Sequence, residues 1–460
     1  MRLSFIIQDY HESRNSYPMG TAYLARVLRD CGHEIEIYNM AIYHWTIEQM
    51  LEYFKKEKFG AICVSFICGY YTYTQIKLVL KALNSIPQRP PIILGGHGPA
   101  PVPEFFLLKH HTEFVSLGEA EKTLPRLIEA IEKEEDTTRI DGFACRVGDE
   151  VIINKKLDPV QDLDTIPFPA WDLFPMEAYI VNHAEPSKPM DRFGVVTSSR
   201  GCPYLCNFCY RMEDGIRFRS VDNVMEEIGW LVDKYNINYF QFQDELLMVS
   251  RSRIFEICDG IEKNGFKFEF YLNGRLNIVT KDMLKRLKEL GCRFINYGIE
   301  SADEVVLKNM DKRLTLKQIH EGLQATIDAG IEPGVNLLFG NIGDTRETFR
   351  KNHELLLKYD TFCQNRTIKP VSPFPGTPLY NYAIKERLIK DAEDFYEKLH
   401  MNSDRFTVNF SDVPDKEAYE LIFEANKDLV SEYHRRKAEA QIEGLRKVYS
   451  GTELGFRGVR

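Results

Sequence analysis

Long apolar segments are missing from this sequence of 460 residues. No run approaches the roughly 18 apolar residues of a membrane-spanning helix, so we expect no membrane span. The amino-terminal residues MRLSFIIQDY alternate like a buried strand, and they reach Gln8 and Asp9 too early for a signal peptide. We therefore expect a soluble, cytoplasmic protein.

An excess of positive charge is missing as well. The chain has 59 Lys and Arg residues against 68 Asp and Glu residues, and its formal net charge is -9. Proteins that bind nucleic acid usually present a basic face. The composition therefore indicates a small molecule, and not a nucleic acid, as the partner.

Clustered cysteines are rare in this chain. Seven of the ten cysteines lie well apart, as is typical of small buried residues in a reducing compartment. The exceptions are Cys202, Cys206 and Cys209, which share the stretch SSRGCPYLCNFCYR. No C-x2-C pair occurs beyond residue 209, so we expect no second cluster of cysteine ligands.

Residues 1–138 alternate between short apolar strands and helices. The strands are expected in LSFIIQ, HEIEIYN, AICVSFI, PPIILGG and EFVSLGE. This alternation predicts an α/β domain with a doubly wound, Rossmann-like parallel sheet. Ligands of such sheets bind beyond the carboxyl ends of the strands, where the loops of this chain are rich in glycine and polar residues. We expect a binding surface at that edge.

Residues 139–190 have a different composition. The stretch DGFACRVGDEVIINKK predicts a hairpin with Gly148 and Asp149 in its turn. Pro167, Pro169 and Pro175 follow within nine positions. Prolines at this density predict an extended linker between two domains.

Residues 191–382 resume the alternation in six strand-helix units. Sequential units of this kind predict a partial, TIM-like (β/α)6 barrel, with its chemistry at the carboxyl ends of the strands. The three cysteines directly follow the first of these strands, FGVVTSS. Residues 383–460 are mainly helical, and we interpret them as packing elements with a solvated face.

The spacing C-x3-C-x2-C discriminates between kinds of metal site. A structural zinc site needs four ligands, usually in two separated pairs, and no fourth cysteine or histidine lies nearby in the sequence. Three thiolates on one short loop instead suit a [4Fe-4S] cluster with one iron left without a protein ligand. An open iron offers a place where a substrate or cofactor can chelate.

The cysteine motif, with Phe208 before its last cysteine, resembles that of the radical S-adenosylmethionine (SAM) enzymes. The resemblance implies a [4Fe-4S] cluster on Cys202, Cys206 and Cys209 that binds SAM by its amino and carboxylate groups. It also implies reduction of SAM to a 5′-deoxyadenosyl radical, with electrons from an external donor of the flavodoxin or ferredoxin type.

Further segments of the barrel resemble SAM-binding segments of that family. FQFQDELL resembles the second-strand motif that holds the methionine amino group, and YLNGRL places a cation where the methionine carboxylate lies. INYGIES resembles a segment that meets the ribose or methionine end, and NLLFGNIGDT resembles the sixth-strand segment that lines the adenine. The SAM-binding residues implied are Phe208, Gln243, Asp244, Glu245, Arg275, Glu300 and Asn336.

The amino-terminal sheet resembles the cobalamin-binding domain of the B12-binding class of radical SAM enzymes, on YPMGTAYLARVLRDCGHEIEIYN, VSFICGYYTYTQIKLVLKAL, ILGGHGPAPVPE and SLGEAEKTLPRLI. The cobalamin-binding residues implied are Pro18, Met19, Gly20, Ser65, Phe66, Gly69, Tyr70, Gly95, Gly96, His97, Gly118 and Glu119.

One departure from the cobalamin pattern concerns the lower ligand to cobalt. Asp9, His11 and Arg14 begin the pattern D-x-H-x-x-G, but its glycine is missing. We therefore expect a corrinoid without a histidine ligand, with the lower face of cobalt against the loop from Ser65 to Tyr73.

Two cofactor signatures on one chain favour a cobalamin-dependent methyltransferase. The resemblance implies hydrogen abstraction from an unactivated substrate carbon, followed by methyl transfer from methylcobalamin. The alternative is a non-methylating radical reaction, such as cyclisation, ring contraction, dehydration or epimerisation. A non-enzymatic corrinoid or cluster carrier would leave Asp244, Arg275 and Glu300 without a role. The substrate cavity is expected to involve Tyr210, Arg211, Tyr297 and Asn336.

Overall fold

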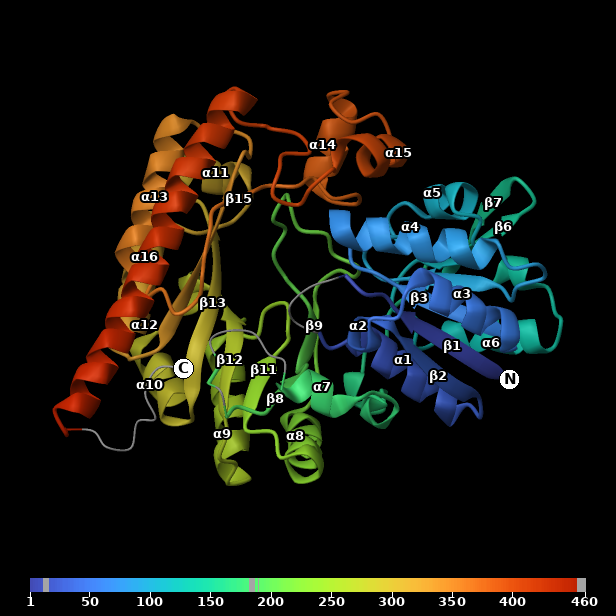
Figure 1. The fold of residues 1–460 in the computed structure, drawn as a ribbon, viewed down its shortest axis with the longest axis horizontal. Helices are drawn as coiled ribbons and strands as arrows, with labels where there is room; N and C mark the ends of the chain where they lie inside the picture. Colours follow the sequence, from blue (N-terminus) through green and yellow to red (C-terminus); the bar gives the residue numbers. More distant parts are fainter. Residues whose placement is uncertain (11–15, 182–186, 189, 453–460) are drawn as a thin grey trace.

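The protein is described by a computed structural model, in which residues 1–10, 16–181, 187–188 and 190–452 are placed. Two sheets lie side by side, each with helices on its outer faces (Figure 1). The first sheet belongs to the amino-terminal half of the chain and the second to the central part. No helix in the placed part of the chain is both long enough and apolar enough to cross a membrane.

The first sheet has the strand order β2-β1-β3-β4-β5-β6-β7. Its first five strands in chain order pair in parallel, which confirms the expected doubly wound sheet. The strands are β1 (Arg2–Ile7), β2 (Glu34–Asn39), β3 (Ala61–Ser65), β4 (Ile92–Gly95), β5 (Phe114–Ser116), β6 (Phe143–Val147) and β7 (Glu150–Ile153).

Strand β3 shows why this sheet is covered on both faces. Ile62 and Val64 belong to one apolar core, whereas Ala61 and Cys63 belong to another. Successive side chains of a strand point to opposite faces, so a continuous apolar run buries both. The covering helices are α1 (Met19–Asp30), α3 (Ile47–Lys56), α4 (Tyr70–Asn84), α5 (Pro103–Lys109) and α6 (Leu124–Glu132).

The predicted hairpin forms, with Gly148 at a positive φ of 63° in its turn. It belongs to the first sheet, because β6 pairs antiparallel with β5. The proline-rich stretch after it is less extended than expected. It contains short 3-10 turns at Leu163–Thr165 and Trp171–Leu173, followed by helix α7 (Met176–Val181). The Trp171 ring is buried and contacts the Tyr17 ring, so this stretch is part of the core between the two sheets.

The second sheet is parallel throughout and has the order β15-β14-β13-β12-β11-β8. Strands β8 and β15 stand at its two ends, so the sheet is an open half-barrel, as the six strand-helix units predicted. The strands are β8 (Phe193–Val196), β11 (Tyr239–Phe242), β12 (Glu269–Gly274), β13 (Cys292–Glu300), β14 (Glu332–Phe339) and β15 (Lys369–Pro370). NLLFGNIGDT begins in the fifth strand, β14, which corrects its expected assignment to the sixth.

Helices cover the outside of the half-barrel (Figure 1). They are α8 (Val221–Tyr235), α9 (Arg251–Lys263), α10 (Lys281–Glu289), α11 (Glu304–Asn309), α12 (Leu316–Asp328) and α13 (Arg346–Tyr359). The long helix α16 (Asp415–Tyr449) packs on this layer through Ala418, Ile422, Ala425 and Leu429, at helical spacing. This agrees with the expected packing helix.

The segment before α16 has a second partner. It contains α14 (Pro378–Lys385), α15 (Ala392–Asp394) and a π-helical turn (Phe395–Leu399). In that turn, the Tyr396 hydroxyl donates to the backbone oxygen of Gly98, and the Glu397 carboxylate accepts from the Tyr73 hydroxyl. The carboxy-terminal segment therefore bridges the half-barrel and the first sheet.

Candidate functional site

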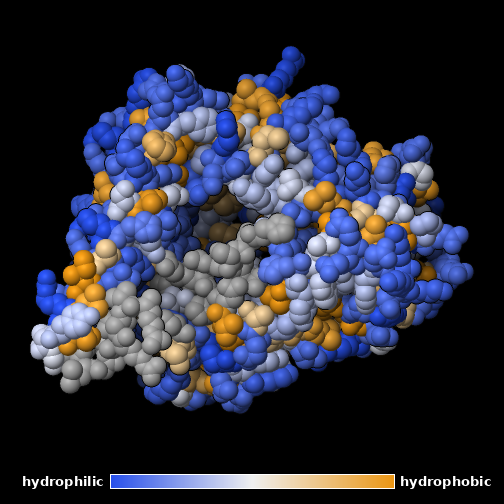
Figure 2. All heavy atoms as spheres, in the orientation of Figure 1, coloured by the Kyte–Doolittle hydropathy of each residue, from blue (hydrophilic) through white to orange (hydrophobic). Residues whose placement is uncertain are grey.

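A cavity of about 530 Å³ lies between the carboxyl edges of the two sheets. Figure 2 shows a hollow between the two halves of the molecule. Residues of both halves form its wall, so neither domain alone makes this cavity. The predicted site residues that line it are His97, Glu119, Cys202, Cys206, Cys209, Tyr210, Arg211, Glu245, Arg275, Glu300 and Asn336.

The three cysteines lie on a loop that two short strands close. Strand β9 (Ser199–Gly201) pairs antiparallel with β10 (Ile216–Phe218). Gly201 has a φ of 93°, and a Cβ there would collide with the backbone oxygen of Gly215. Only glycine accommodates both conditions at low cost. The sequence did not predict this strand pair, because each strand is only three residues long.

Asn207 ties the cysteine loop to three other segments. Its backbone N–H donates to the Met310 oxygen, and its backbone oxygen accepts from the N–H of Leu379. Its side-chain amide exchanges hydrogen bonds with that of Asn341 at 3.1 and 3.2 Å. The loop is therefore held on several sides.

The thiols of this loop suit a cluster better than a single ion. In the placed part of the chain, no three His, Cys, Asp or Glu side chains converge as ligands of one metal ion would. The three thiols nevertheless share the wall of one cavity. A hydrogen bond from Cys209, with the charges of Lys312 and Arg275, lowers the pKa of the Cys206 thiol to about 6. A thiolate is the form that binds iron.

Arg275 follows strand β12 and faces the cavity. Its side chain is 4% exposed and stacks on the Tyr204 ring, with 3.6 Å from the guanidinium carbon to the ring centroid. Its Nε and Nη2 atoms are buried without a hydrogen-bond partner among the placed residues. Such atoms are costly in a folded protein unless a ligand satisfies them. The predicted contact with the SAM carboxylate would supply that partner.

Glu300 ends strand β13 in an unusual conformation. Its φ is 72°, and the pairing of β13 with β14 shifts register between Gly298 and Glu300. The Glu300 carboxylate accepts from Lys312 at 3.0 Å, and both side chains are largely buried. A Cβ on Gly298 would lie 2.5 Å from the Glu300 carboxylate. Backbone strain of this kind is concentrated at functional sites.

A chain of side-chain amides crosses the floor of the cavity. The Arg366 guanidinium donates to Asn336, Asn336 donates to Asn296, and Asn296 donates to Asn273, at 2.7, 2.9 and 3.2 Å. Asn273 then donates to the backbone oxygen of Asp244 at 2.8 Å. A guanidinium only donates and a carbonyl only accepts, so the two ends fix the direction of the chain. One N–H of each amide is left for a ligand.

Only Asn336 of this amide chain was predicted. Asn273 and Asn296 stand opposite each other on neighbouring strands. Their side chains meet through strand register, which no local motif encodes. The signal present in the sequence was a polar residue inside an otherwise apolar strand.

Four of the residues predicted to bind SAM or the substrate lie outside the wall of the cavity. Asp244 is fully buried, and its carboxylate accepts from the Ser198 and Ser199 side chains and the Ser198 backbone N–H. Asp244 therefore organises the junction of β8 and β9. The other three are Gln243, which is exposed, Phe208, whose ring lies 5.7 Å from the Lys312 ammonium, and Tyr297, whose buried hydroxyl bonds to Thr326.

The predicted cobalamin residues lie at the carboxyl edge of the first sheet. A Cβ added to Gly20 would meet nothing within 4 Å, and one on Gly95 would meet only Ser116, at 3.9 Å. The backbone at these two glycines is therefore open to contact by a ligand. Gly96 has a φ of 94° and packs closely against the backbone of Phe66. Of the predicted set, His97 and Glu119 line the cavity.

His97 and Tyr210 face each other across the domain boundary. Their rings meet edge to face, with centroids 5.7 Å apart. Burial lowers the pKa of His97 and raises that of Tyr210 to about 12, so both groups are neutral at pH 7. They present hydrogen-bonding groups where the two halves of the cavity meet.

The loop predicted for the lower face of cobalt is held by the carboxy-terminal segment. The Cys68 thiol lies 3.1 Å from the Tyr396 hydroxyl. Tyr73 bonds to His110 and to Glu397. Asp9 lies 2.6 Å from the His44 imidazole. His11 and Arg14, which began the incomplete histidine-ligand pattern, lie outside the placed residues.

Two family models match separate parts of the chain. The model of the B12 binding domain matches residues 14–128, and the model of the Radical SAM superfamily matches residues 196–356. An uncharacterised methyltransferase of Pyrococcus horikoshii is 28% identical over 81% of this chain and 79% of its own length. An anaerobic magnesium-protoporphyrin IX monomethyl ester cyclase of Cereibacter sphaeroides is 24% identical over 83% of this chain and 63% of its own length.

A solved structure shares the fold. The radical SAM methyltransferase TsrM of Kitasatospora setae, with cobalamin and a [4Fe-4S] cluster bound, superposes with a TM-score of 0.67. The match has 17% sequence identity and covers 84% of this chain and 75% of that one.

The half-barrel with its cysteine loop, preceded by a cobalamin-type sheet, defines a B12-binding radical SAM enzyme, and this chain belongs to that family. Its cofactors are a [4Fe-4S] cluster, SAM and cobalamin. The cysteine loop, the unsatisfied Arg275 and the open glycine edge of the first sheet fit these groups.

Proposed function

We propose that this protein is a cobalamin-dependent methyltransferase that methylates an unactivated carbon of a small-molecule substrate. The observation that carries the proposal is one cavity with walls from both cofactor domains. When bound, the cluster and SAM supply a 5′-deoxyadenosyl radical that abstracts a hydrogen atom from a substrate carbon, and cobalamin supplies the methyl group. The methyltransferase relative from Pyrococcus horikoshii supports the proposal.

The residues on the barrel side would bind and orient SAM. Cys202, Cys206 and Cys209 would hold the cluster, and Arg275 would bind the carboxylate of SAM with the two donors that have no partner in the protein. Glu300 and Asn336 would bind the ribose or adenine side. Holding the reacting groups in one geometry accounts for much of the rate of such a reaction.

The residues at the boundary would orient the substrate. His97 and Tyr210 are neutral and lie between the two cofactor regions, so they suit hydroxyl or amide groups of a substrate. Arg211 lines the same wall. With both cofactors and the substrate bound, the filled cavity would also exclude water and oxygen, which would otherwise quench a radical. An external donor of the flavodoxin or ferredoxin type would supply the electron.

A test of this proposal does not require the substrate. The anaerobically reconstituted protein is incubated with hydroxocobalamin, a reductant and SAM labelled in its methyl group, and the corrinoid fraction is analysed by mass spectrometry. We expect label in the corrinoid and release of S-adenosylhomocysteine. Release of 5′-deoxyadenosine with no label in the corrinoid would contradict methyl transfer and favour a non-methylating radical reaction.

A matched pair of variants controls this test. Cys206→Ala should abolish formation of 5′-deoxyadenosine, whereas Cys258→Ala, a buried cysteine on α9, should retain it. Full labelling of the corrinoid in Cys206→Ala, with no 5′-deoxyadenosine from the wild type, would instead support a corrinoid carrier without radical chemistry.

A further inference from the structure

A group of charged side chains joins the cysteine loop to the first sheet. Glu119 lies in the loop after β5 and accepts from Arg217 of β10, and from Arg200 of β9 at 3.0 Å. Glu121, two residues further, pairs with Arg200 at 2.7 Å. We call these four residues the boundary ion cluster.

The boundary ion cluster is shielded from solvent. The exposed fractions of its side chains are 13% for Glu119, 9% for Glu121, 19% for Arg200 and 10% for Arg217. Removing one partner from a buried ion pair is strongly unfavourable because the other charge stays behind. The two domains therefore cannot separate here without a large cost in free energy.

The arginines stand at the two stems of the cysteine loop. Arg200 precedes Cys202 by two positions, and Arg217 lies on the strand that closes the loop. A second contact secures the same place, because the Glu119 backbone N–H donates to Glu213 at 3.3 Å. Gly118 permits this approach, since a Cβ there would lie 2.5 Å from the Glu213 carboxylate.

The carboxylates belong to the first domain, to the edge of its sheet that takes the corrinoid. Their loop follows β5, which pairs with β4, and β4 leads into Gly96 and His97. A shift of this edge would move Glu119, and with it both stems of the cysteine loop. One ion cluster therefore links the walls of both cofactor sites.

We propose that Glu119, Arg200 and Arg217 are positioning residues that couple occupancy of the corrinoid site to SAM binding at the cluster. This assigns Glu119 a role other than the direct contact with cobalamin expected from the sequence. The inference rests on the proposed binding of both cofactors in one cavity. Coupling between two binding sites is reciprocal, so each cofactor should tighten the binding of the other by the same factor.

The experiment measures that factor in the full-length reconstituted protein. The Kd for SAM is measured with and without hydroxocobalamin, and the Kd for hydroxocobalamin with and without SAM. In the wild type we expect each ligand to tighten the other about tenfold. In Glu119→Gln we expect the coupling factor to fall to near one, whatever the affinity of each ligand alone.

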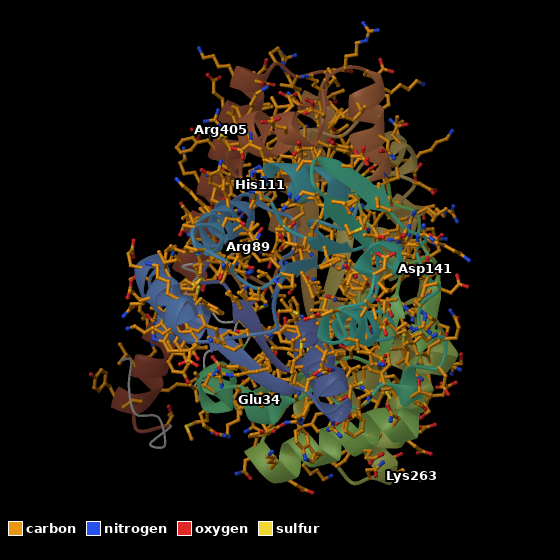
Figure 3. The ribbon with its side chains drawn as sticks, turned by 90° about the vertical axis from the view of Figure 1, so that its right-hand side faces the viewer. Glu34, Arg89, His111, Asp141, Lys263 and Arg405 are labelled. Atoms are coloured by element: carbon orange, nitrogen blue, oxygen red, sulfur yellow. The ribbon has the colours of Figure 1, made fainter. Side chains whose placement is uncertain are left out.

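A carboxylate in the same domain provides the control. Glu113 accepts from Arg89 at 2.7 Å, and Arg89 also donates to the His111 backbone oxygen. Arg89 and His111 are labelled in Figure 3, where the first domain faces the viewer. These partners all belong to the first domain, so Glu113→Gln should lower stability but keep the coupling factor. Arg217→Gln repeats the test from the barrel side if Glu119→Gln does not fold.

Two results would overturn the inference. One is binding of both ligands to the wild type without mutual tightening, which would leave the cofactor assignment intact. The other is retention of the full coupling factor in Glu119→Gln and Arg217→Gln. If hydroxocobalamin fails to bind the wild type at all, the proposed function fails together with this inference.

Discussion

Replacement of Arg275 by methionine should separate ligand affinity from stability. The guanidinium is buried, stacks on Tyr204 and leaves two donors unsatisfied among the placed residues. A hydrogen bond to a charged group contributes about 1.5–3 kcal/mol. At about 1.4 kcal/mol for each factor of ten, Arg275→Met should raise the Kd for SAM by roughly 10- to 150-fold.

The same substitution should not destabilise the protein without its ligand. Methionine gives up the stacking on Tyr204, which contributes about 0.5–2 kcal/mol. It also removes a buried cation without an ion partner, whose burial costs several kcal/mol. We therefore expect the free energy of unfolding, measured by urea titration, to stay equal to that of the wild type or to rise by about 1 kcal/mol.

Arg293 provides the matched control. It also stacks on a tyrosine ring, Tyr239, at 4.3 Å, but its guanidinium is paired with Asp191 at 2.9 Å, and it does not line the cavity. Arg293→Met should lower the free energy of unfolding and leave the Kd for SAM unchanged. An unchanged Kd in Arg275→Met would refute the assignment of Arg275 to the SAM carboxylate.

Three further predictions concern the cluster, the cavity floor and pH. Cys206→Ala should bind at least tenfold less iron than Cys258→Ala, measured by iron analysis after reconstitution; equal iron content would contradict the cluster assignment. Asn296→Leu should lower the free energy of unfolding by about 1–3 kcal/mol, because two hydrogen bonds between part-buried amides are lost; a change below about 0.5 kcal/mol would rule out an amide chain that matters for stability. Burial raises the pKa of Asp344 from 3.8 to about 6, so its folded form binds more protons between these values. The free energy of unfolding of the wild type, relative to Asp344→Asn, should therefore fall as the pH rises from about 4 to about 6; parallel pH curves would show that the shift is absent.

The sequence predicted the parts of this protein that local patterns encode. Apolar runs such as AICVSFI predicted parallel strands buried on both faces. Such a strand carries apolar side chains on both faces, so both have to be covered. The spacing of Cys202, Cys206 and Cys209 predicted a cluster loop, since three thiols on one short loop lie close in space whatever the rest of the fold. Arg275 and Glu300 were implied by the resemblance of YLNGRL and INYGIES to SAM-binding segments.

The tertiary structure decided which side chains reach the cavity. Asp244 is of a residue type that often binds ligands, yet its carboxylate accepts hydrogen bonds from Ser198 at the junction of β8 and β9. Asn273 and Asn296 become neighbours only through the register of β12 and β13. Glu119 meets Arg200 and Arg217 across about eighty to one hundred residues of chain. Pairings over such distances depend on the packing of whole domains, and no local sequence pattern specifies them.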